Sequence, residues 1–186
     1  MIGIAVGIGL SAACGFRVFV PLLVMNLGSL AGLLRLSPGF EWIGSHYCTI
    51  AFGTATLVEV LAYTIPWLDH ILDLIASPAA IIAGIIATAS MVMDLSPFLK
   101  WTLALIAGGG AAAIVQGVTV ILRTKSSALT AGTGNVFVSS LELVGSIIAA
   151  LLAITVPIVC VALIAFLCIF VIWKAGRLFV GRMKIR

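Results

Sequence analysis

The longest apolar stretch of the chain runs from Val136 to Trp173 and contains one charged residue, Glu142. As a single straight helix it would be about 57 Å long at 1.5 Å per residue. That is about twice the hydrocarbon thickness of a bilayer, which is roughly 30 Å. Two membrane-spanning helices with a tight hairpin near Pro157 fit this stretch better than one long helix kinked at the proline.

Composition supports lipid as the solvent for the whole chain. Of its 186 residues, 63% are hydrophobic and 9% are charged, whereas a soluble domain has about a quarter charged residues. So few charges cannot cover the surface of a soluble fold of this size. Glycine is abundant, with 19 residues, as expected where membrane helices pack closely.

Four further apolar segments have the composition of membrane spans. They are residues 2–34, 49–67, 78–93 and 101–122, separated by polar connections. The first is longer than one span needs, and Pro21, Asn26 and Gly28 are places where it is expected to kink or end early. We therefore expect an all-α, polytopic transmembrane bundle of about six spans, forming a single domain over residues 1–186.

The basic residues predict a cytoplasmic tail. Five of the ten lie within residues 174–186, directly after an apolar run. With six spans, Arg123 and Lys125 join this tail on the cytoplasmic side and both termini are inside. With five spans, Arg35 and Lys100 join it instead. Either arrangement places seven basic residues on the cytoplasmic side of the membrane and two on the other side. Charge alone therefore leaves the number of spans open.

The chain contains an internal similarity. Gly9–Arg17 resembles Gly108–Gln116, and Thr56–Glu59 resembles Ser139–Glu142. The similarity divides the chain into probable repeat halves, residues 2–98 and 99–173. A three-helix unit that is repeated once must be inverted in the membrane, because three is odd. Transporters built from inverted repeats place their sites near the midplane, between the halves.

Three ionisable residues lie inside the expected spans: Arg17, Glu59 and Glu142. A charge at the centre of a span costs about 2.5–3.5 kcal/mol on insertion scales, so each is expected to face a partner or water. We expect Arg17 to pair with one glutamate and the other to be protonated, hydrogen-bonded or occupied by a cation. The alternative is an Arg–Glu pair that only fixes helix packing.

Three uncharged polar residues, Gln116, Ser139 and Asn135, are further candidates for a substrate or ion pathway. Side chains of these types also form hydrogen bonds between membrane helices. Gln116 and Ser139 suit that packing role, with Gln116 expected to hold helices together rather than to bind a ligand.

Asp69, His70 and Asp73 form the one cluster with metal-ligand residue types. A helix would place Asp69 and Asp73, four residues apart, on one face. An amphipathic turn at the membrane surface with solvated acids explains the cluster better, so we expect no metal and no cofactor. The sequence lacks a nucleophile elbow, a Walker loop and a His-Glu-x-x-His motif, and an enzyme is not expected.

Several segments together resemble an uncharacterised family of small bacterial membrane proteins, domain of unknown function 4126. These segments are Ala13–Pro21, Ser37–Phe40, Pro66–Asp73 following Glu59, and Gly132–Glu142. The resemblance covers nearly the whole chain and implies a multi-pass helical protein of the bacterial inner membrane, without an established activity. Tyr63-Thr64 and Leu143 stand where the family pattern has further charged residues, so this member keeps only the centre of a charge network.

These observations favour a small transporter or channel whose ionisable residues lie at the interface of two inverted halves. A structural or interaction protein is the alternative, and a lipid-headgroup enzyme at Asp69, His70 and Asp73 ranks third. The expected partners are membrane lipids and a second copy of the chain. The net charge of +4 is no nucleic-acid signature, and the sequence does not identify a substrate.

Overall fold

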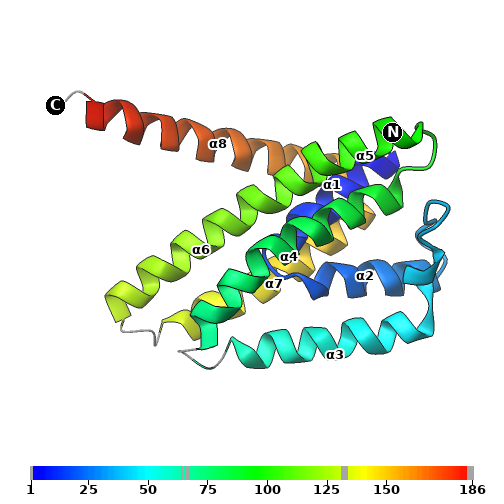
Figure 1. Cartoon of the computed structure of the whole chain (residues 1–186), viewed down its shortest axis with the longest axis horizontal. Helices are drawn as coiled ribbons and strands as arrows, with labels where there is room; N and C mark the ends of the chain where they lie inside the picture. The colour runs from blue at the N-terminus through cyan, green and yellow to red at the C-terminus, as the bar shows by residue number, and fades with distance from the viewer. Residues whose placement is uncertain (1, 64, 66–67, 131–133, 184–186) are drawn as a thin grey trace.

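The computed structural model describes residues 2–63, 65, 68–130 and 134–183, with the side chains of 68–71, 171–172 and 174–183 left out. The described residues are helical and contain no strand, which confirms the all-α bundle (Figure 1). The segments are α1 (Ile2–Cys14), α2 (Phe19–Leu30), η1 (Glu41–Gly44), α3 (His46–Ala62), α4 (Leu68–Met91), α5 (Pro97–Leu103), η2 (Ala104–Gly109), α6 (Gly110–Thr130), α7 (Asn135–Thr155) and α8 (Pro157–Met183).

Three described helical stretches are long and apolar enough to cross a membrane: Leu72–Met91, Pro97–Thr130 and Asn135–Thr155. Large apolar side chains cover the outside of the bundle, among them Leu74, Phe137 and Phe166, each at least 70% exposed. A soluble protein rarely exposes apolar surface on this scale. The fold is that of a membrane protein.

The first expected span is two helices rather than one. A Cβ at Gly9 of α1 would lie 2.6 Å from the Cβ of Ala153, and one at Gly28 of α2 would lie 3.5 Å from Ile154 Cδ1. Gly9, in the second half of α1, and Gly28, near the end of α2, therefore both lie beside the end of α7. The pair forms a hairpin that returns to the end of the bundle where it started (Figure 1).

The helix is interrupted at residues 15–18, between α1 and α2, for two reasons. Pro21 has no N–H to bond the carbonyl of Arg17, and its ring would clash with that carbonyl in a continuous helix. A Cβ at Gly15 would lie 2.6 Å from the carbonyl oxygen of Ala112, so only glycine fits this close approach to α6. Pro21 therefore prevents a continuous helix at Arg17, four residues before the proline.

Other boundaries also differ from expectation. α4 begins at Leu68 rather than near Pro78, which lies inside the helix. The expected polar loop at 123–135 is helical as far as Thr130, so Arg123 belongs to the bundle. The division of the last apolar stretch at residues 155–157 is confirmed.

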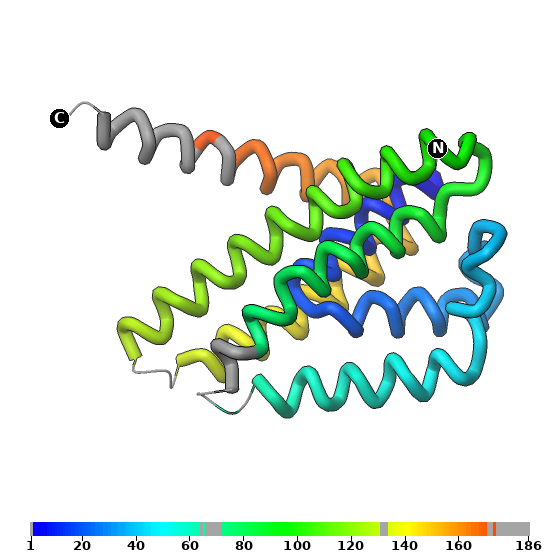
Figure 2. Tube along the Cα trace, viewed as in Figure 1, coloured from blue at the N-terminus to red at the C-terminus, as the bar shows by residue number. Residues whose placement is uncertain are grey.

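α1 lies in the middle of the bundle and contacts α2, α4, α6, α7 and α8 (Figure 2). Small residues allow the close approach: a Cβ at Gly7 of α1 would lie 2.9 Å from the Cα of Thr88 on α4. The Ser11 hydroxyl adds polar contacts, 2.8 Å from the carbonyl oxygen of Gly7 and 2.7 Å from Thr88 Oγ1. Packing of small residues with buried hydroxyl hydrogen bonds is typical of membrane helices.

We call the end of the bundle that holds Ile2 the amino end. α3, the continuous helix of residues 97–130 and α8 run away from the amino end, and α4 and α7 return to it (Figure 1). Because the α1–α2 hairpin returns to its own end, the first and last helices begin at the same end of the bundle. The expected number of six spans stays a prediction.

Two glycines, Gly108 in the π-helical segment η2 and Gly110 at the start of α6, provide a test of this packing. A Cβ at Gly108 would lie 2.8 Å from the carbonyl oxygen of Gly84, whereas one at Gly110 meets nothing within 4 Å. We expect Gly108→Ala to lower stability by about 1–3 kcal/mol through overpacking. Gly110→Ala, the matched control, should be neutral or raise helix stability by up to about 1 kcal/mol. Thermal unfolding of both proteins in detergent measures the difference, and equal midpoints would contradict this packing.

Candidate functional site

Buried ionisable side chains from five segments meet around one tyrosine. We call this group the charge cluster; its members are Arg17, Glu59, Tyr63, Asp73, Arg123 and Glu142. The cluster lies toward the end of the bundle opposite the amino end, where α3 and α6 end and α7 begins. Glu59, Arg123 and Glu142 each lie within about two turns of that end of their helix. Arg17 and Arg123 are 1% and 3% exposed, so their charges are compensated inside the protein.

The strongest ion pair of the cluster joins α6 to α7. Arg123 Nε donates to Glu142 Oε1 at 2.8 Å, and Arg123 Nη2 pairs with Oε2 of the same carboxylate. This two-point contact is the geometry in which an arginine binds a carboxylate most strongly. Arg17 lies 4.0 Å from Glu142 Oε2, so the expected pairing of Arg17 with a glutamate holds, as the weaker of two contacts.

Sequence reasoning missed Arg123, although a signal for it exists. Gln116, Thr119 and Arg123 follow a spacing of three and four residues, which places them on one face of a helix. All three are buried. A polar face continuing through residue 123 indicates a longer helix rather than the loop that we expected.

Asp73 is also part of the cluster. Its Oδ1 accepts hydrogen bonds from Arg123 Nη1 and, at 3.2 Å, from the Tyr63 hydroxyl. The expectation of a solvated acid at this position is therefore wrong. The side chains of Asp69 and His70 lie outside the described residues. No group of three metal-ligand side chains occurs among the side chains that are described.

Both arginines contact the ring of Tyr63. The guanidinium carbon of Arg17 lies 4.2 Å from the ring centroid and that of Arg123 lies 3.9 Å from it. Cations are attracted to the face of an aromatic ring, more strongly where water is excluded. Tyr63 therefore stabilises two buried like charges, a role that no sequence pattern indicated.

Glu59 binds backbone rather than an arginine. Its Oε1 accepts from the N–H of Val18 at 2.9 Å, and its Oε2 from the N–H of Phe19 at 3.2 Å. These N–H groups belong to the start of α2, where helix donors lack partners and the helix dipole is positive. Glu59 thus fixes the inner end of the hairpin to α3.

Of the three uncharged candidates, Ser139 contacts the charge cluster, whereas Asn135 and Gln116 have other surroundings. Arg17 Nη2 donates to the Ser139 carbonyl oxygen at 3.0 Å and to its hydroxyl, so Ser139 supports the cluster. Asn135 Nδ2 donates to Ser127 Oγ at 2.6 Å and holds α7 to α6. Gln116 is buried on α6 beside Gly15, away from the ion pairs.

The two glutamates singled out by the internal similarity, Glu59 and Glu142, come from α3 and α7, which run in opposite directions (Figure 1). The repeat itself stays a prediction. Gly9–Arg17 lies at the break of a hairpin, whereas its counterpart Gly108–Gln116 lies inside the continuous helix of residues 97–130.

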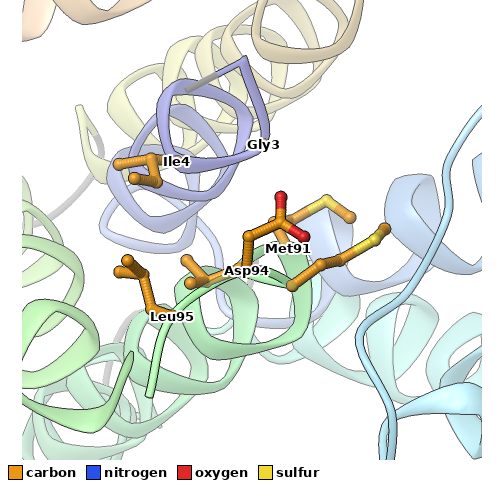
Figure 3. Close-up of a pocket in the computed structure, with 7 residues that line it drawn as sticks. Gly3, Ile4, Met91, Asp94 and Leu95 are labelled. Atoms are coloured by element: carbon orange, nitrogen blue, oxygen red, sulfur yellow. The ribbon is translucent and has the colours of Figure 1, made fainter. Parts of the chain in front are cut away.

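A separate pocket lies at the amino end, between the start of α1 and the connection from α4 to α5. Figure 3 shows Asp94 and Met91 beside Gly3 and Ile4 around this pocket. Of its seven lining residues, Asp94 alone carries an ionisable side chain. The chemistry of the described part of the protein is therefore concentrated in the charge cluster.

A double-substitution cycle tests the main ion pair. Arg123→Gln and Glu142→Gln each leave a buried charge without its partner, which costs about 3–5 kcal/mol. The double variant should be less destabilised than the sum of the two by about 0.5–3 kcal/mol. Arg123→Gln combined with Glu41→Gln, at an exposed residue outside the cluster, should be additive. Unfolding in detergent provides the comparison, and additivity in both cycles would count against the pair.

Comparison with known proteins agrees with the resemblance seen in the sequence. The chain matches the family described as "Domain of unknown function (DUF4126)" over residues 4–177. No curated protein and no solved structure matches it. With nearly its whole length matched, this helical membrane protein belongs to the DUF4126 family.

Proposed function

We propose that the protein is a small transport protein of the bacterial inner membrane, not an enzyme, and that it moves a proton or another cation through the charge cluster. The observation that carries the proposal is the break between α1 and α2, whose new helix start faces the buried Glu59 carboxylate. Interrupted helices that end at buried ionisable groups form the ion and substrate sites of many transporters.

Energetic cost favours transport over a purely structural role. Replacing buried ion pairs by apolar residues of similar volume is often neutral or stabilising. A protein that only needed to hold helices together would therefore gain little from four buried charged residues, Arg17, Glu59, Arg123 and Glu142. Glu59 in particular binds backbone amides at a helix break, a position that a packing pair does not require.

The path of the chain supports an orientation for this protein. We propose that α1–α2 is a re-entrant hairpin and that α3, α4, residues 97–130, α7 and α8 cross the membrane. Lys125 and three basic residues of α8, Lys174, Arg177 and Arg182, then fall on the side opposite the amino end, against Arg35 and Lys100 at it. The positive-inside rule places the amino end outside the cell.

Reporter fusions test this orientation. An alkaline phosphatase domain inserted after Asp94, at the amino end, should be active, because that enzyme folds outside the cytoplasm. A green fluorescent protein fused after Arg186 should fluoresce in the cytoplasm. Activity of a phosphatase fused at both termini, or at neither, would contradict a hairpin followed by five crossings.

Flux through proteoliposomes tests the function itself. We expect the purified protein to dissipate a pH gradient, or to couple it to another cation, and Glu59→Gln and Glu142→Gln each to reduce the rate at least about tenfold. A loss of that size corresponds to roughly 1.4 kcal/mol in the barrier. Glu41→Gln, at an exposed residue outside the cluster, is the matched control and should keep the full rate.

Folding of each variant is checked by size-exclusion chromatography before reconstitution. If the folded wild-type protein moves no ion across the vesicle membrane, the transport proposal fails. Co-purification with another membrane protein, without flux, would then support a structural role.

A further inference from the structure

A second feature adjoins the charge cluster: a pocket between α3 and α4 with a volume of about 370 Å³. This volume lies in the range of small-molecule sites, roughly 300–1,000 Å³. The start of α2 closes one side of it. Its lining includes Thr54, Val58, Glu59, Tyr63, Ile75 and Ala76.

The mouth of the pocket lies on the outer surface of the bundle. Val58 of α3 and Ile75 of α4 line it and are 65% and 61% exposed. Both helices carry apolar side chains outward, in the manner expected of a surface that faces lipid. A molecule dissolved in the membrane could therefore enter between the two helices without crossing water.

Glu59 supplies the charge of this pocket. Each of its carboxylate oxygens accepts one backbone N–H, which leaves further lone pairs for a ligand. Among the described lining residues Glu59 is the one carboxylate, and neither Arg17 nor Arg123 is among them. Tyr63 also lines the pocket, and its ring contacts both arginines. A group that enters the pocket therefore meets a carboxylate at its wall.

The remaining walls do not suit a hydrated inorganic ion. Small hard cations prefer several oxygen ligands. Besides Glu59, the polar side chains among the described lining residues are those of Thr54 and Tyr63. Together they supply two hydroxyl oxygens, too few to complete the shell of about six oxygen ligands that a small hard cation takes. Apolar walls around one carboxylate match an organic cation with an apolar body.

We propose that the pocket between α3 and α4 binds lipophilic organic cations from the membrane, with the positive charge placed against Glu59. The inference rests on the proposed function in treating Glu59 as the cation site, and it specifies the class of substrate. A cation bound there would compete with the inorganic cation or proton for the same carboxylate.

Binding of tetraphenylphosphonium to the full-length protein in lipid nanodiscs tests the proposal. We expect saturable binding, and no specific binding of tetraphenylborate, an anion of nearly the same shape. Glu59→Gln should weaken tetraphenylphosphonium binding at least about tenfold, equal to the loss of one charge contact of roughly 1.4 kcal/mol. Ala76→Phe, which fills the pocket without touching the charge, should weaken it similarly. Ala51→Phe, on the exposed face of α3, should not.

Each outcome separates this inference from the proposed function. If the cation and the anion bind equally, or if Glu59→Gln leaves binding unchanged, the pocket holds any apolar molecule, such as a lipid acyl chain, and the inference is overturned. Loss of tetraphenylphosphonium binding with intact Glu59-dependent proton flux would overturn the inference alone. Glu59-dependent binding in a protein that carries no flux would overturn the transport proposal alone.

Discussion

The arrangement of the whole bundle depends on two hydrogen bonds from the start of α2 to the Glu59 carboxylate. A helix that begins inside a membrane protein leaves the N–H groups of its first turn without partners. Each such group costs several kcal/mol in an apolar interior. The carboxylate satisfies two of them and complements the positive end of the helix dipole. With this contact the chain can turn back inside the bundle, and the direction of every later helix follows from that reversal.

The same contact connects the hairpin to the rest of the charge cluster. Arg17, in the break, reaches Ser139 and Glu142 of α7, and its guanidinium lies on the ring of Tyr63. Arg123, whose guanidinium also lies on that ring, connects α6 to the cluster, and Asp73 connects α4 to it. Movement of the hairpin would therefore disturb ion pairs in all of these helices. The proposed transport function would use this coupling between the helix break and the buried charges.

The sequence predicted the elements whose signals are local and missed those that depend on tertiary contacts. Apolar length gave the helical membrane fold, Pro157 gave the α7–α8 boundary, and the rarity of charges in apolar runs identified Glu59 and Glu142. The return of α2 could not be predicted, because it depends on the contact of Gly15 with Ala112 across the bundle. Arg123 was assigned to a loop because a charge at the end of an apolar run resembles a membrane boundary. Partners from other helices, among them Glu142 and Asp73, make the burial of that arginine favourable.

The central claim, that α1 and α2 form a hairpin whose ends lie together, is tested most directly by a distance between spin labels. Ile2 and Leu33 are 68% and 73% exposed, so labelled cysteines at these positions, with the four native cysteines replaced, should not disturb packing. A continuous helix would separate them by about 47 Å at 1.5 Å per residue. Pulsed electron paramagnetic resonance in nanodiscs should give a single distance far shorter than this. A distribution centred near the continuous-helix value would contradict the account.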